Sequence, residues 1–125
     1  VSVLAGPRII EMQRLVRDVI IAPHVQDFAV RLVLATQPQG AVAGEAAKRW
    51  LRYGAGPRGA QALVLAAKVK ALLNERLNVS FDDLRSVALP ALRHRVLLNF
   101  EAQAEGIDTD RVLRELLEQV PQTVK

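Results

Sequence analysis

The sequence has no cysteine among its 125 residues, and only 4% of them are aromatic. Without cysteine there is no disulfide framework, no thiolate zinc site and no cysteine nucleophile. This composition is compatible with a reducing compartment, and we expect a cytoplasmic location. No uncharged apolar run approaches the roughly 18–20 residues that a membrane span needs, so no membrane is expected as a partner. Strands favour aromatic and β-branched side chains, so scarce aromatics beside abundant alanine and leucine favour helices.

The length predicts one domain with its own hydrophobic core. Half of the residues are hydrophobic and 24% are charged. A chain of this size buries roughly two thirds of its unfolded surface without metal or disulfide crosslinks. We therefore expect a single domain over residues 1–125. The sequence begins at Val1 rather than at methionine, as expected of a piece cut from a longer protein.

Positive charge is concentrated in the middle of the sequence. Between Lys48 and Arg76 there are seven cationic residues and one acidic residue, a net charge of +6. The whole chain has a net charge of +4, so the residues outside this stretch carry −2. A positive centre indicates an anionic partner such as phosphate, nucleic acid or an acidic protein surface. A solvated surface rich in lysine and arginine explains the same charge, and both interpretations stay open.

Apolar residues recur at helical spacing in several segments, and proline stands where a first helical residue would. Cap residues mark two further helix starts, at Ser80 with Asp83 and at Asp108. In chain order we expect an amphipathic helix from Pro7 with apolar positions to Ile20, a helix from Pro23 to Gln37, a loop over 37–44, a short helical turn over 45–51, a long helix from Pro57 to about Glu75, a helix from Ser80 to about Leu89, and a last helix from Asp108 to Pro121.

The long helix after Pro57 is apolar on nearly every side. Its only polar stripe runs through Gln61, Lys68 and Glu75. A helix of this kind must be surrounded by other elements. The sequence therefore predicts an all-α fold, a small helical bundle around this central apolar helix.

Two features near the next helix have local explanations. The neighbouring carboxylates Asp82 and Asp83 fall in a first helical turn, where the helix dipole favours negative charge, so capping explains them. Pro90 cannot donate a backbone hydrogen bond, so we expect the helix to end near Leu89. The apolar run 96–98 is compatible with a strand or with a buried helix.

The motifs of nucleotide hydrolysis and of metal binding are missing from these residues. No glycine precedes a lysine, so there is no GxxxxGK[ST] phosphate loop, and no serine lies in a GxSxG sequence. His24 and His94 are far apart without a matching group of carboxylates, so no metal site is expected. We expect these 125 residues alone neither to hydrolyse a nucleotide nor to hold a cofactor.

The segment YGAGPRG, residues 53–59, is the candidate site. Gly56 is the expected helix cap, Pro57 the first helical residue and Arg58 the second. An arginine there meets the positive end of the helix dipole, which costs a few tenths to about 1 kcal/mol unless an anion binds. The guanidinium fork suits phosphate oxygens. An exposed arginine after a proline cap explains the segment equally well.

Several short motifs follow one another along the chain. They are RYGAGPRG at 52–59, an alanine-rich helix, NVS at 78–80 with DDL at 82–84, LRHR at 92–95 and NFE at 99–101. In this order and spacing they resemble the C-terminal helical lid of MoxR-type AAA+ ATPases. The resemblance covers about Val3 to Val120, and it implies a nucleotide-binding α/β domain before Val1.

The resemblance also implies a role for the candidate site. Arg58 falls on the sensor-2 arginine of the family, which reaches from the lid to the terminal phosphate of ATP held with Mg²⁺ by the core domain. It is then the catalytic residue of this chain and, with Pro57 and Gly56, part of its nucleotide-binding segment. The family commonly has serine where Gly56 stands. A glycine cap costs only a few tenths of a kcal/mol relative to serine, so the role of Arg58 survives, but a serine contact near the nucleotide is lost.

The partners implied by the resemblance are the protein's own AAA+ core domain and neighbouring subunits of a homo-oligomeric ring. The family context adds chaperone-like remodelling or metal-cofactor insertion together with proteins that carry von Willebrand type A domains. Arg93, His94 and Arg95 match the family's LRHR motif, and they suit either an interface with an acidic surface or the cationic end of a helix.

Two other functions are compatible with the same residues. A small basic helical module could bind nucleic acid through residues 48–76, but this stretch lacks interleaved aromatics and its long helix is too apolar to lie in a groove. Nucleic acid is therefore the less expected partner. A protein-interaction bundle is the third interpretation.

Overall fold

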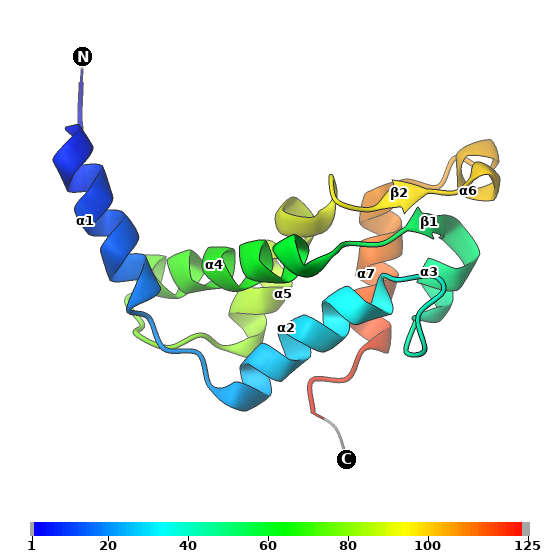
Figure 1. Cartoon of the computed structure of the whole chain (residues 1–125), viewed down its shortest axis with the longest axis horizontal. Coiled ribbons are helices and arrows are strands. Elements are labelled where there is room, and N and C mark those ends of the chain that lie inside the picture. Colours follow the sequence, from blue (N-terminus) through cyan, green and yellow to red (C-terminus); the bar gives the residue numbers. More distant parts are fainter. Residues whose placement is uncertain (1, 124–125) are drawn as a thin grey trace.

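The computed structural model describes residues 2–123 and is built from helices with one short two-stranded sheet (Figure 1). Strands β1 (Leu51–Tyr53) and β2 (Leu97–Leu98) pair antiparallel, with Leu51 opposite Leu98 and Tyr53 opposite Leu97. The expected all-α bundle is confirmed apart from this sheet. In chain order the elements are α1 (Gly6–Arg17), α2 (Pro23–Ala35), α3 (Glu45–Trp50), β1 (Leu51–Tyr53), α4 (Pro57–Leu73), α5 (Phe81–Leu92), β2 (Leu97–Leu98), α6 (Phe100–Ala104) and α7 (Thr109–Gln119).

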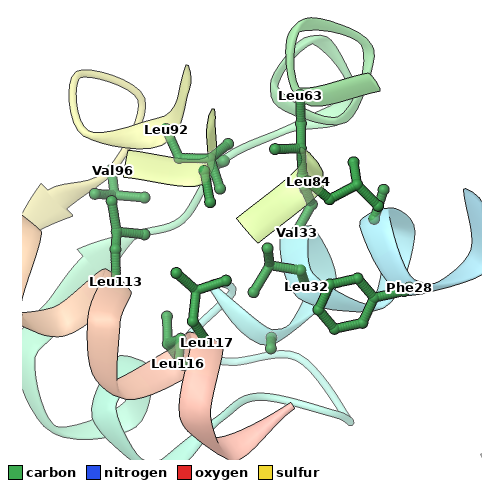
Figure 2. Packing of buried hydrophobic residues seen from close by; sticks show 14 of the residues in the cluster. Phe28, Leu32, Val33, Leu63, Leu84, Leu92, Val96, Leu113, Leu116 and Leu117 are labelled. Carbon is green, nitrogen blue, oxygen red and sulfur yellow. The ribbon is translucent and has the colours of Figure 1, made fainter. Parts of the chain in front are cut away.

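The hydrophobic core lies where α2, α4, α5 and α7 meet. Figure 2 shows leucine side chains of α4, α5 and α7 gathered around Phe28, Leu32 and Val33 of α2. Helix α4 contacts α1, α2 and α5, and α7 contacts α3 and α5. Figure 1 shows α1 and α6 at opposite ends of the molecule. The largest fully buried apolar side chains are Phe28, Leu32, Leu63, Leu84, Leu92, Val112, Leu113 and Leu116.

The helix starts lie where proline and cap residues predicted them. Pro23 and Pro57 are the first residues of α2 and α4. At the start of α5, the Ser80 hydroxyl accepts from the Asp83 N–H at 3.2 Å and the Asp83 carboxylate accepts from the Ser80 N–H at 2.8 Å. Asp108 caps α7 by accepting from the Arg111 N–H at 2.8 Å. These signals act within one helical turn, which is why the sequence alone predicts them.

The expected end of the helix near Leu89 is wrong, because α5 continues through Pro90 to Leu92. Pro90 removes the hydrogen bond to the Ser86 carbonyl. Both Pro90 and Ser86 are exposed, so water can bind that carbonyl, and Leu92 at the end of the helix is fully buried. The burial of Leu92 offsets the lost hydrogen bond.

We expected other elements to surround α4, but only one line of residues along this helix is buried. Its buried residues recur every four positions, which places them along one line of the helix. On another side, Leu65, Val69 and Leu73 are exposed. Helix α1 has no buried residue at all and ends at Arg17, before the expected Ile20. The buried stripe of α4 consists of Gly59, Leu63, Ala67 and Ala71.

The sheet and α6 were not expected from the sequence. The open choice at 96–98 is settled as a strand, because Leu97 and Leu98 pair with β1. The Asn99 side chain then accepts from the Ala102 N–H at 2.8 Å and caps α6. Its amide also donates to the Arg49 carbonyl at 2.7 Å. Asn99 therefore joins the start of α6 to the end of α3.

A salt bridge fixes the start of α5 to the end of α4. The Arg76 guanidinium binds both oxygens of the buried Asp83 carboxylate, at 2.7 and 2.5 Å. The hydrogen bond from Arg76 holds the pKa of Asp83 below its usual value, and the Ser80 N–H acts in the same direction. This carboxylate therefore stabilises the fold in its charged form.

We predict that this contribution is lost in acid. Because the folded pKa of Asp83 is depressed, its stabilisation is complete above the unfolded pKa of about 4 and disappears as the pH falls through the folded pKa. Replacing Asp83 with asparagine should cost about 1.5–3 kcal/mol at neutral pH, where a charge-assisted hydrogen bond is lost. Urea unfolding of both proteins should show this difference shrinking below about pH 4. A difference that stays constant into strong acid would contradict the prediction.

Candidate functional site

Arg58 is the second residue of α4, and its side chain is exposed to solvent. Within residues 2–123, the Arg58 side chain makes no hydrogen bond and no ion pair. Gly56 is the helix cap in extended conformation, and no side chain caps this helix end. The first turn of a helix presents backbone N–H groups without intrahelical partners. The start of α4 thus offers an unneutralised guanidinium beside the positive end of a helix dipole.

The loop that precedes α4 is attached to the C-terminal end of α2. The Ala55 N–H donates to the Thr36 hydroxyl oxygen at 2.9 Å, and the Gln37 amide donates to the Ala55 carbonyl at 2.5 Å. Thr36 and Ala55 are fully buried. A Cβ on Gly54 would collide with the backbone carbonyl of Thr36, so only glycine allows the two chains to approach this closely.

The first turn of α4 is also packed against α5 and the LRHR segment. A Cβ on the buried Gly59 would lie 2.9 Å from Ala55 Cβ, 3.3 Å from Leu92 Cδ2 and 3.6 Å from Arg95 Cδ. The hydrocarbon part of the Arg95 side chain therefore lies next to the residue that follows Arg58. This packing leaves no room for a larger residue at position 59.

The structure separates the three charged residues of the LRHR motif. Arg93 Nε lies 3.1 Å from Asp110 Oδ1 at the start of α7, so this arginine ties the end of α5 to α7. His94 is exposed. Arg95 is exposed as well, and its side chain approaches the start of α4. The sequence did not distinguish these environments, because Asp110 and Gly59 are distant in the chain.

The remaining chemistry is sparse in the part of the chain that the structure describes. Across residues 2–123, no group of three or more His, Asp and Glu side chains is placed to hold a metal ion. No described helix is both long and apolar enough to cross a membrane. The start of α4 is therefore the site on which a functional interpretation rests.

The sequence pattern missed Thr36 and Gln37 as contributors to this site. It ended the second helix at Gln37 and assigned no hydrogen-bond partner to either residue. The available signal was a polar residue on a buried stripe, since such a hydroxyl must find a hydrogen-bond partner. The identity of that partner, Ala55, depends on how α2 packs against the loop.

Comparison with known proteins matches residues 44–116 to the AAA lid domain family. The chain belongs to this family. The lid is 28% identical over 95% of its length to the chaperone MoxR1 of Mycobacterium tuberculosis, and 33% identical over 94% to the uncharacterized protein YeaC of Bacillus subtilis. It superimposes with a TM-score of 0.86 and 33% identity, over 95% of its length, on a crystal structure of a candidate ATPase from Cytophaga hutchinsonii.

The lid spans only about a third of the length of these relatives: 32% of MoxR1, 34% of YeaC and 36% of the C. hutchinsonii chain. The resemblance to the helical lid of MoxR-type AAA+ ATPases is confirmed. It extends beyond the matched family region to α1 and α2, because the similarity to MoxR1 and YeaC covers nearly the whole lid.

Proposed function

We propose that this lid works in a MoxR-type AAA+ ATPase and that Arg58 is its sensor-2 arginine. The observation that carries the proposal is the exposed guanidinium at the second position of α4, which no carboxylate among residues 2–123 neutralises. A cation held at a helix N-terminus without a counter-charge is unfavourable in the isolated lid. An anion bound at this helix end would reverse that effect.

The residues at the start of α4 are suited to phosphate. A guanidinium offers a planar fork of N–H donors. Pro57 has no N–H and the Gly59 N–H donates to the Gly56 carbonyl at 2.8 Å, so within residues 2–123 the backbone donor that this turn adds is the Arg58 N–H. In the proposed enzyme, ATP and Mg²⁺ are held by an α/β core domain of the same protein and supply the phosphoryl group that is hydrolysed. Arg58 stabilises negative charge on that group, while Gly56 and Pro57 set the direction in which Arg58 leaves the loop.

The same proposal defines partners of the lid. The first is the core domain, whose approach to α4 would couple the lid angle to the nucleotide state. The others are neighbouring subunits of a homo-oligomeric ring in the cytoplasm. A chaperone-like activity is supported by the name of one relative, chaperone MoxR1. Partners with von Willebrand type A domains are part of the proposal through the family resemblance alone. The test of the central step is the ATP turnover of the full-length protein after replacement of Arg58 by alanine.

A nucleic-acid-binding function is less well supported, because several cations of the basic region are already engaged. Lys48 lies 3.5 Å from Glu45, Arg76 binds Asp83, and the Arg49 guanidinium lies 4.4 Å from the centre of the Trp50 ring. These contacts leave fewer free cations for a phosphate backbone.

We therefore predict no measurable binding of the lid to duplex DNA at about 0.15 M salt, where counterion release contributes little for so few phosphate contacts. Fluorescence anisotropy with a labelled duplex at increasing salt measures this. Submicromolar binding that weakens steeply with salt would favour the nucleic-acid-binding module instead.

A further inference from the structure

The loop between β1 and α4 is anchored at Ala55 by two side chains from the end of α2. The Thr36 hydroxyl donates its own proton to the Val33 carbonyl at 2.6 Å, so its oxygen is available to accept from the Ala55 N–H at 2.9 Å. The Gln37 amide donates to the Ala55 carbonyl. Both backbone polar groups of the buried Ala55 are thus satisfied by side chains rather than by a helix or a sheet.

The loop is not tightly packed at Gly56, the residue that follows Ala55. A Cβ on Gly56 would meet nothing within 4 Å. A cavity of about 270 Å³ lies between this part of the loop and α2, and Val33, Leu34, Gly56 and Pro57 are among its lining residues. The loop therefore has free space beside it on the way to Arg58. The hydrogen bonds at Ala55 hold it at a fixed distance from α2.

Ala55 is in turn in contact with the turn that carries Arg58. The position of a Cβ on Gly59 lies only 2.9 Å from Ala55 Cβ, so the first turn of α4 sits directly on this residue. A shift of Ala55 toward the cavity would move that turn as well.

We propose that Thr36 and Gln37 are positioning residues for Arg58. Neither touches the nucleotide; they act through Ala55, which fixes the direction of the first turn of α4. This inference rests on the proposed role of Arg58 as the sensor-2 arginine. It connects the end of α2 with the rate of ATP hydrolysis.

The test uses steady-state ATP hydrolysis by the full-length protein with Thr36→Val. Valine keeps the shape but removes the hydroxyl, so the buried Ala55 N–H loses its acceptor and the loop relaxes. We expect kcat to fall about tenfold, within the 100-fold that a 1 Å misplacement can cost. The KM for ATP should change less than kcat. Thr36→Ser, which restores the hydroxyl, should return kcat to near the wild-type value.

Two further variants separate positioning from a general loss of stability. Val112→Ala creates a small cavity in α7, far along the chain from the loop, and should lower the melting temperature without lowering kcat while the protein is folded. In the double variant Thr36→Val with Arg58→Ala, kcat should equal that of Arg58→Ala alone, because residues acting as one unit are not additive. If Thr36→Val does not fold, Gln37→Met removes the other hydrogen bond from a half-buried position and should behave in the same way.

The outcomes distinguish the two proposals. If Arg58→Ala lowers turnover but folded Thr36→Val does not, the positioning role is overturned and the sensor role stands. If Thr36→Val lowers kcat equally in the presence and absence of Arg58, Thr36 does not act through Arg58, and the inference is again overturned. Unchanged turnover in Arg58→Ala overturns the proposed function itself.

Discussion

Replacing Arg58 with alanine in the full-length protein should lower kcat for the proposed ATP hydrolysis about 100-fold or more, the usual cost of removing one preorganised donor from a transition state. The reason is electrostatic: charge develops on the transferring phosphoryl group, and a guanidinium already in place stabilises it without reorganisation. Arg58 is exposed, so its side chain is free to point out of the lid toward such a group. Phosphate release under saturating ATP measures the effect.

The fold should tolerate this replacement. Arg58 has no hydrogen-bonded or ionic partner in the part of the chain described, so the free energy of unfolding should change by no more than about 0.5 kcal/mol. Arg58→Lys is the matched variant: it keeps the charge but loses the planar fork, and an intermediate kcat is expected. Wild-type turnover by folded Arg58→Ala would show that the sensor role lies elsewhere.

Replacing Gly54 with alanine should destabilise the lid by about 1–3 kcal/mol or more, as expected when a packed position must accept an additional methyl group. The new Cβ would meet the backbone carbonyl of Thr36, which cannot rotate away as a flexible side chain would. The chain must therefore separate from the end of α2, and the hydrogen bonds at Ala55 weaken. Urea unfolding of the isolated lid, followed by far-UV circular dichroism, measures the loss.

Gly56, two residues further along, provides the matched control. Its backbone is extended, with φ −96° and ψ −168°, and a Cβ there would have no neighbour within 4 Å. Alanine restricts the unfolded chain but is a poorer N-cap than glycine, so the two effects oppose each other and Gly56→Ala should change the free energy of unfolding by no more than about 0.5 kcal/mol. Gly56→Ser should gain a few tenths of a kcal/mol as a better helix cap. Equal losses for Gly54→Ala and Gly56→Ala would mean that close approach to Thr36 is not what requires glycine.

The predicted elements that agree with the structure depend on signals confined to one helical turn. Proline at a first helical position and the Ser80 and Asp108 caps marked the starts of α2, α4, α5 and α7. The elements that were missed depend on distant partners. Strand β1 exists because β2, more than forty residues later, pairs with it, and periodicity in so short a segment cannot reveal that.

Two errors have the same origin. Helix α5 continues past Pro90 because Leu92 is buried in the core at its end. The sequence does not show that the core has space for Leu92. One side of α4 is exposed and α1 has no buried residue, because the described part of the lid has no further helix that packs on these surfaces. An apolar pattern indicates that a surface is suited to burial, but it does not say what covers it.

From the sequence alone follow the helical class, most helix starts and the place of Arg58 in the first turn of an apolar helix, since these depend on residues within a few positions of one another. Only the tertiary structure decided that Thr36 and Gln37 hold Ala55, that Arg93 pairs with Asp110, and that Arg95 lies beside Gly59. Each of these contacts joins residues at least fifteen positions apart, and the packing of the helices brings them together.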